Sequence, residues 1–306
     1  MSQPTSELAI SVADLTKDYD GLRAVDSANF EVPLGTICGF VGPNGSGKTT
    51  TIRMLLGLIE PSAGQGEILG EPIGHPERYL ARVGAMIEGP AFYPALSGEE
   101  NLRVLATLGG CDQSRARELL ALVGLEDRGG SKYKTYSLGM KQRLGIAAAL
   151  LPDPKLLILD EPTNGLDPAG IQEIRDLLTD LSKKGVTVFV SSHLLSEIEM
   201  ISDYLVILRR GKVIFFGKTE DLLLQSRATI TAIPQNPEDM AKLHSLVESA
   251  GHQARIDSKE LHIQANPEWG SELNKLAFEN GIVLREITPV RATLEETFFE
   301  LTEEAR

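Results

Sequence analysis

The first sixty residues alternate between strand-like and helix-like patterns. Apolar and polar residues alternate around Leu8–Val12 and again near Phe30–Val32, which predicts two β-strands joined by a turn. A continuous apolar run, Thr36–Val41, predicts a short buried strand that ends at a glycine-rich loop. Beyond the loop, Lys48–Leu58 has the composition of a helix that stops at a segment containing glycine and proline.

Helical periodicity dominates the next part of the chain, and strand patterns return after it. The predicted helices are Glu99–Leu108, Ser114–Val123, Leu138–Leu151 and Ala169–Lys183, and the predicted strands are Leu156–Leu159, Val186–Val190 and Tyr204–Leu208. Alternation of strands with helices favours a largely parallel sheet with helices packed on it. The strand at 156–159 is apolar throughout, as expected where both faces of a sheet are covered. We therefore expect an α/β domain over residues 8–225, with a helical subdomain over residues 88–152.

The C-terminal part of the chain has a strand and helix order of its own. Strands are predicted at 228–233, 253–256, 261–264 and 282–287, and helices at 237–249 and 267–279. This β-α-β-β-α-β order is that of a ferredoxin-like unit. We therefore expect a small α+β accessory domain over residues 228–306, with an amphipathic helix at 293–301 and a role in dimerisation or regulation.

Charge and apolar content narrow the range of partners. The 306 residues carry a formal net charge of -13, which repels phosphate backbones and disfavours nucleic-acid binding. No signal peptide is expected, and the longest apolar runs, such as 146–151, are far too short to span a bilayer. Cys38 and Cys111 lack any metal-ligand spacing, which favours unpaired thiols in a reducing compartment. We therefore expect a cytoplasmic chain, so that any membrane-spanning part of its assembly belongs to another polypeptide.

A glycine-rich segment follows the strand at 36–41 and opens the helix that begins at Lys48. It consists of Gly42, Pro43, Asn44, Gly45, Ser46, Gly47, Lys48 and Thr49, the P-loop pattern G-x-x-x-x-G-K-T. Glycines let successive backbone N–H groups point at phosphate oxygens, and the helix N-terminus adds the positive end of its dipole. We expect Lys48 to neutralise the β- and γ-phosphates of ATP, Thr49 to bind Mg²⁺, and Thr50 to belong to the same ATP site. The alternative, a plain glycine-rich turn, leaves the Lys-Thr pair unexplained.

Two carboxylates, Asp160 and Glu161, end the apolar strand at 156–159. Adjacent side chains of a strand point to opposite faces, but the chain turns at the end of the strand, so both can reach one ligand. Asp160 suits a hold on Mg²⁺, and Glu161 suits the base that orients and deprotonates the attacking water. An acidic turn after a core strand is the alternative, and it is disfavoured beside a P-loop.

The segment at the start of the helix at 138–151 indicates the family. Tyr136, Ser137, Leu138, Gly139 and Met140 resemble the L-S-G-G-Q signature of the ATP-binding cassette family. Ser137 matches its serine and Gly139 its second glycine. Leu138 and Met140 depart from its first glycine and its glutamine. A serine at a helix start beside a small residue suits an anion site, although Ser137 alone would be a plain helix N-cap.

Further segments resemble the motifs of this family in the expected order. Asn164–Asp167, directly after the two carboxylates, resembles the D-loop, which includes Asp167. His193 resembles the switch histidine that contacts the γ-phosphate, and Tyr19 resembles the aromatic residue that stacks on adenine. A structural histidine and an ordinary hairpin tyrosine are the alternatives for these two positions. The resemblance spans residues 8–220.

Membership of this family implies an architecture and a set of partners. The fold would be a P-loop NTPase core, a RecA-like sheet plus antiparallel strands, with a helical subdomain. The ligands would be ATP and Mg²⁺. In this family two cassettes dimerise head to tail, so that the signature of one completes the P-loop site of the other. A homodimer is therefore expected, held at the inner face of the cell membrane by a permease on a separate chain.

One substitution narrows the resemblance to a branch of the family. Glu88 stands where the Q-loop of the family has glutamine. This glutamate and the tail at 293–302 resemble the corresponding segments of exporters of drugs and peptide antibiotics. We expect Glu88 to engage Mg²⁺ only in the closed dimer, and a solvated loop carboxylate is the alternative. Phe92 and Tyr93 are candidates for an exposed docking site, with buried packing residues as the alternative.

Two other classes of function fit less well. A cassette protein that acts on ribosomes or DNA is disfavoured by the acidic charge and by the single set of motifs. A small-molecule kinase or GTPase that shares only the P-loop would leave the signature segment unexplained, and the guanine-specifying pattern N-K-x-D does not occur. Because the permease contacts the cargo, the substrate cannot be derived from this chain.

Overall fold

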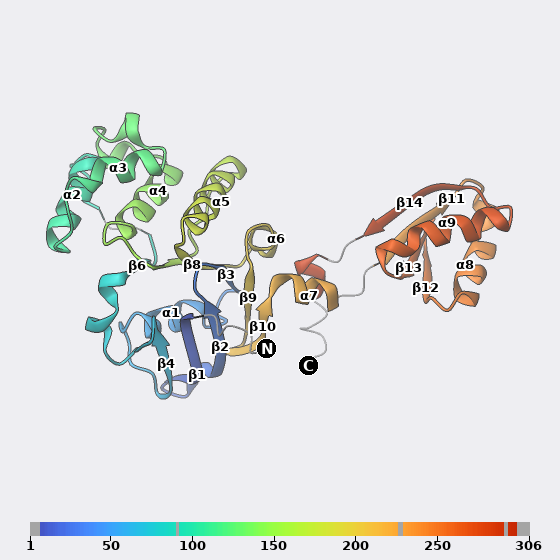
Figure 1. Ribbon diagram of the computed structural model, residues 1–306, viewed down its shortest axis with the longest axis horizontal. Coiled ribbons are helices and arrows are strands. Elements are labelled where there is room, and N and C mark those ends of the chain that lie inside the picture. The colour runs from blue at the N-terminus through green and yellow to red at the C-terminus, as the bar shows by residue number, and fades with distance from the viewer. Residues whose placement is uncertain (1–6, 90–91, 226–228, 291–292, 299–306) are drawn as a thin grey trace. The chain divides into compact units, whose positions relative to one another are not determined.

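The computed structural model describes residues 7–89, 92–225, 229–290 and 293–298. Residues 1–219 and 220–306 form two compact units (Figure 1). The helix α7 (Thr219–Gln225) begins at the boundary between them.

An antiparallel sheet of four strands opens the first unit. Its strands are β1 (Leu8–Tyr19), β2 (Leu22–Pro33), β4 (Ala63–Ile68) and β5 (Glu71–Pro72), in the order β2-β1-β4-β5. The turn between β1 and β2 consists of Asp20 and Gly21, whose positive φ angles of 36° and 92° are those of a hairpin turn that matches the strand twist. Both strands of the hairpin are longer than their apolar patterns predicted.

A six-stranded sheet forms the centre of this unit. It contains β3 (Ile37–Val41), β6 (Val83–Met86), β7 (Leu156–Asp160), β8 (Thr187–Ser192), β9 (Tyr204–Arg209) and β10 (Lys212–Lys218), in the order β10-β9-β3-β8-β7-β6. The pairs from β9 to β6 are parallel, and β10 is antiparallel to β9. The predicted α/β class, with a parallel sheet and added antiparallel strands, is therefore confirmed.

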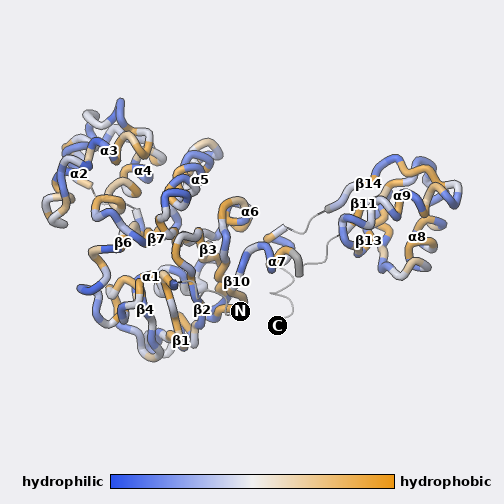
Figure 2. Tube along the Cα trace, in the orientation of Figure 1, coloured by the Kyte–Doolittle hydropathy of each residue, from blue (hydrophilic) through white to orange (hydrophobic). Residues whose placement is uncertain are grey.

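Helices surround the parallel sheet. They are α1 (Lys48–Leu55), α5 (Pro168–Lys183) and α6 (Leu195–Glu199). Hydrophobic and hydrophilic residues alternate along α5 (Figure 2), and Ile174, Leu178 and Leu181 on its inner face are buried. The helix α1 is shorter than the predicted range to Leu58, because Gly57 takes a left-handed conformation (φ 67°) that ends the helix.

A helical segment separates β6 from β7. It contains α2 (Gly98–Leu108), α3 (Arg115–Leu122) and α4 (Leu138–Ala149), which lie together in Figure 1. A capping box begins α2, since Ser97 accepts a hydrogen bond from the Glu100 N–H while the Glu100 carboxylate accepts one from the Ser97 N–H.

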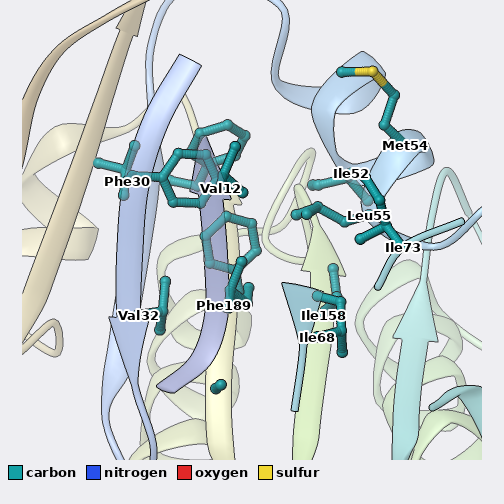
Figure 3. Close-up of a cluster of buried hydrophobic side chains, with 14 of the residues drawn as sticks. Val12, Phe30, Val32, Ile52, Met54, Leu55, Ile68, Ile73, Ile158 and Phe189 are labelled. Atoms are coloured by element: carbon teal, nitrogen blue, oxygen red, sulfur yellow. The ribbon is translucent and has the colours of Figure 1, made fainter. Parts of the chain in front are cut away.

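The hydrophobic core of the first unit joins its two sheets (Figure 3). Phe189 of β8 stacks on Phe30 of β2, with ring centroids 6.1 Å apart, and lies 4.9 Å from the ring of Phe40 in β3. Ile52 and Leu55 of α1 belong to the same cluster and are fully buried. This packing fixes the strand β3 and the helix α1, and so also the loop that connects them.

The second unit is built on a four-stranded antiparallel sheet. Its elements are β11 (Thr229–Pro234), α8 (Met240–Ser249), β12 (Ala254–Asp257), β13 (Glu260–Gln264), α9 (Gly270–Glu279) and β14 (Leu284–Val290), and its strand order is β12-β13-β11-β14. Ile230, Leu261 and Ile263 of the sheet pack with Leu243 and Leu273 of the two helices. Residues 294–298 are helical, and residues 299–301 of the predicted terminal helix lie outside the described residues.

Candidate functional site

The glycine-rich loop lies between β3 and α1. Gly45 and Gly47 have φ angles of 79° and 106°, which residues with a side chain rarely adopt. A Cβ atom on Gly42 would lie 2.4 Å from the carbonyl oxygen of Leu208 on β9. The glycines are therefore required by the curvature of the loop and by its contact with the sheet. The Ser46 hydroxyl is buried and forms no hydrogen bond with the described residues, so it is available to a ligand.

Lys48 is the first residue of α1, and it is only 6% exposed. Its Nζ donates a hydrogen bond to the Gly42 carbonyl oxygen at 2.6 Å and lies 3.2 Å from Glu161 Oε1. The side chain therefore curls back over the loop, which places the ammonium group at the start of the helix, where phosphates bind in nucleotide-binding proteins.

A chain of hydrogen bonds links three elements through Asp160. The Thr49 hydroxyl on α1 donates to Asp160 Oδ2 at 2.8 Å, and the Ser191 hydroxyl on β8 donates to Asp160 Oδ1 at 2.5 Å. Asp160 is 7% exposed and ends β7. A hydroxyl and a carboxylate in contact provide the hard oxygen ligands that Mg²⁺ prefers, so the residues present fit this ion.

Glu161 takes a left-handed backbone conformation, with φ 50°. Its N–H donates to Ser191 Oγ at 3.0 Å, and its Oε2 lies 2.7 Å from His193 Nδ1. This turn at the end of β7 brings the two adjacent carboxylates to the start of α1, where Asp160 contacts Thr49 and Glu161 contacts Lys48. Glu161 thus lies between the Lys48 ammonium and the His193 ring, in a position to accept a proton from a water molecule near the loop.

Lys48, Thr49 and Glu161 border a cleft of about 590 Å³, whereas Asp160, Ser191 and His193 do not line it. It is lined by Tyr19, Leu22, Arg23, Ala24, Asn44, Gly45, Gly47, Lys48, Thr49, Thr50, Glu161, Arg210 and Gly211. Tyr19, at the end of β1, is 42% exposed, and the ammonium of Lys17 lies 5.1 Å from the centre of its ring. The cleft therefore contains both an exposed aromatic ring and the glycine-rich loop, which suits a nucleobase at one end and phosphates at the other.

The signature residues do not line this cleft. Ser137 caps α4, because its hydroxyl accepts a hydrogen bond from the Met140 N–H at 3.2 Å. Leu138 is 48% exposed. Asp167 caps α5 in the same way, with Oδ1 3.0 Å from the Gly170 N–H. The cleft of a single chain therefore does not include the predicted signature and D-loop residues, which are Ser137, Leu138, Gly139, Met140 and Asp167.

Glu88 also lies off the cleft. Its carboxylate, 69% exposed, forms an ion pair with Arg53, which is one turn after Thr49 on α1. The predicted contact of Glu88 with Mg²⁺ would require this pair to open.

The aromatic residues after Glu88 differ in their surroundings. Tyr93 is 59% exposed. Phe92 instead packs edge-on against Tyr133, with ring centroids 5.1 Å apart. Only Tyr93 therefore remains a candidate for docking.

Ser191 and Arg210 are site residues that the sequence reasoning missed. Ser191 follows the apolar strand at 186–190, and its neighbour in the sheet, Asp160, lies thirty-one positions earlier in the chain. The signal was present, since two serines, Ser191 and Ser192, end a strand in which they directly follow the apolar residues 188–190. Only the parallel pairing of β7 with β8 shows that the Ser191 hydroxyl contacts the Asp160 carboxylate.

Comparisons with known proteins agree on one family. The family described as "ABC transporter" matches residues 25–164. The bacitracin transport ATP-binding protein BcrA of Bacillus licheniformis is 43% identical over 301 residues, covering 95% of this chain and 96% of that protein. The lantibiotic transport ATP-binding protein SrtF of Streptococcus pyogenes is 41% identical over 205 residues, covering 67% of this chain and 89% of that protein.

A solved structure described as the ATP-binding subunit of an ABC transporter has a TM-score of 0.63 and 34% identity, and the match covers 71% of this chain and 92% of that one. Across the described ranges of this chain, no helix is both long and apolar enough to cross a membrane.

Proposed function

This chain belongs to the ABC transporter family of ATP-binding proteins, and we propose that it hydrolyses ATP to power the export of a peptide antibiotic or a similar amphipathic compound. One observation carries the proposal: the Lys48 ammonium, the Thr49–Asp160 pair and the Glu161 carboxylate all meet at the glycine-rich loop. This arrangement supports the proposal, because it would bring a positive charge for phosphates, oxygen ligands for a metal ion and a general base for water into one site.

The position of each residue supports a role for it in the proposed reaction. Lys48 would exchange the Gly42 carbonyl oxygen for oxygens of the β- and γ-phosphates, with the loop N–H groups as further donors. Thr49 and Asp160 would hold Mg²⁺, which neutralises charge on the phosphate oxygens when it is bound. Glu161 would orient and deprotonate the attacking water, while His193 holds the Glu161 carboxylate through its ring nitrogen.

A second copy of the chain is proposed to complete the site. Ser137 lies at the N-terminus of α4 and outside the cleft of its own chain. In a head-to-tail homodimer, Ser137 and Gly139 of one copy would face the γ-phosphate bound by the other. Opening and closing of this dimer around two ATP molecules would drive the transport cycle.

The membrane-spanning part is proposed to be a permease on a separate chain, which would hold this subunit at the inner face of the cell membrane. The relatives named for bacitracin and lantibiotic transport support a peptide antibiotic as the cargo. The exposed Tyr93, close after Glu88, is the candidate contact with the permease.

The hydrolytic part of the proposal is tested by phosphate release from the purified chain with Mg²⁺ and ATP. Lys48→Ala should weaken ATP binding and abolish turnover, whereas Lys183→Ala, an exposed lysine on α5, serves as the control with unchanged activity. Equal ATP affinity of Lys48→Ala and wild type would contradict the P-loop assignment.

The transport part is tested by purification from mildly solubilised membranes and identification of the membrane polypeptide that accompanies the chain. Co-expression of the two should protect sensitive cells against bacitracin or a lantibiotic, and Glu161→Gln should remove that protection. Protection by the Glu161→Gln variant would show that hydrolysis in this site does not drive export.

A further inference from the structure

The turn between β9 and β10 contains an unusual residue. Arg209 pairs with Lys212 across the hairpin, so the turn consists of Arg210 and Gly211. Their φ angles are 49° and 81°. Two-residue turns with positive φ at both positions strongly prefer Asn, Asp or Gly at the first, because other side chains are strained there. Strain of this kind is retained where the residue has another role.

In two other turns of the first unit, the positive φ of the first residue has a structural explanation. The turn between β1 and β2 uses Asp20, a favoured residue, before Gly21. The turn between β4 and β5 has Leu69 at φ 52°, but Leu69 packs partly buried against the hydrophobic core. Arg210 has neither explanation. It is exposed, and within the described part of the chain its side chain makes no hydrogen bond or ion pair.

The hairpin tip is fixed against the glycine-rich loop. The Gly211 N–H donates to the Ser46 carbonyl oxygen at 3.0 Å, and the Gly211 carbonyl oxygen accepts from the Asp26 N–H at 2.8 Å. Arg210 therefore lines the same cleft as Lys48. The other arginine of the cleft, Arg23, is already paired with Asp18 at 2.9 Å and with Asp26 at 3.1 Å. Arg210 is the guanidinium whose donors remain available to a ligand.

We propose that Arg210 is a nucleotide-binding residue that contacts the phosphate groups of ATP from the β9–β10 hairpin. This inference rests on the proposed function, because it assumes that the cleft binds ATP. A guanidinium offers several N–H donors in a fixed plane, which suits phosphate oxygens. The strained turn holds this group at the cleft while the backbone of the next residue is bonded to the loop.

Arg210→Asn separates the two roles of the residue. Asparagine is favoured in this turn, so the variant should unfold at the same temperature as wild type or a higher one without nucleotide. Its dissociation constants for ATP and ADP, measured by calorimetric titration, should rise about three- to tenfold, as expected for loss of one typical hydrogen bond at an exposed side chain. Binding of adenosine should be unchanged. Lys212→Gln removes one positive charge from the same hairpin outside the cleft and is the matched control, with unchanged ATP affinity.

The outcomes distinguish this proposal from the proposed function. If wild type binds ATP and Arg210→Asn binds it equally well, the role of Arg210 is refuted while the function stands. An equal loss for ATP and adenosine, or a loss of the same size in Lys212→Gln, also refutes a phosphate contact. If wild type itself binds no ATP, the proposed function fails. Arg210→Lys, which keeps the charge, should lose less affinity than Arg210→Asn.

Discussion

Replacement of Ser191 by alanine would remove one hydroxyl that bonds both the Asp160 carboxylate and the Glu161 backbone N–H at the end of β7. The Ser191 side chain is fully buried. Its hydroxyl donates to Asp160 Oδ1 at 2.5 Å and accepts from the Glu161 N–H at 3.0 Å. Asp160 would lose a donor, and the Glu161 N–H would lose its acceptor in a strained left-handed conformation.

The two hydrogen bonds of Ser191 determine how much stability the Ser191→Ala variant should lose. A hydrogen bond to a charged group contributes about 1.5 to 3 kcal/mol, and a buried donor left without an acceptor adds to the loss, so we expect a destabilisation of about 2 to 4 kcal/mol. For a unit of this size, the melting temperature should fall by roughly 5 to 15 °C. Because Asp160 is a proposed Mg²⁺ ligand, the Mg²⁺ concentration for half-maximal ATPase activity should also rise.

Ser192→Ala provides the matched control. Ser192 is the next residue of β8, it is 1% exposed, and its hydroxyl accepts a hydrogen bond from the Leu194 N–H at 3.0 Å. It contributes a bond of similar length to a different partner, so its removal should cost stability without changing the Mg²⁺ dependence. Thermal unfolding and Mg²⁺ titrations of ATPase activity would be measured for both variants. The same Mg²⁺ dependence in both would refute the positioning role of Ser191.

Two further predictions concern Glu88 and the second unit. Glu88→Gln should raise the Mg²⁺ concentration needed for ATPase activity, with basal turnover largely kept. Arg53→Gln frees Glu88 from its ion pair and should lower that concentration. The same Mg²⁺ requirement as wild type in both variants, measured with the permease present, argues against a metal role for Glu88. Deletion of residues 228–306 should leave a folded core that binds ATP, because Lys48, Asp160 and Glu161 lie in the first unit. A soluble, folded truncation that no longer binds nucleotide would contradict the assignment of ATP binding to the first unit alone.

Local patterns were sufficient for much of the fold and of the site. The apolar run before Gly42 and the helix after it predicted the loop between β3 and α1, because a P-loop depends on residues that are adjacent in the sequence. The strands β4, β5, β6 and β10 were missed. Residues 63–68 contain two glycines and few apolar residues. In β6, Gly84 is required because a Cβ atom there would lie 2.0 Å from the Ala149 carbonyl oxygen at the end of α4.

The missed parts of the site depend on contacts between distant segments. Ser191 meets Asp160 only because β7 and β8 are parallel neighbours. Arg210 reaches the cleft only because its hairpin is hydrogen-bonded to the glycine-rich loop through Gly211. Glu88 pairs with Arg53 across thirty-five positions of the chain. Such pairings have no local pattern in the sequence, and the structure is needed to find them.

We propose that Glu161 acts on water beside ATP bound at the loop, within a dimer of this chain. Glu161→Gln keeps the shape and hydrogen bonding of the side chain but removes the base. Its phosphate release should fall to background with ATP affinity retained, and light scattering should show a dimer that forms with ATP and persists. Wild-type rates of phosphate release in Glu161→Gln, or a monomer at saturating ATP, would contradict the account.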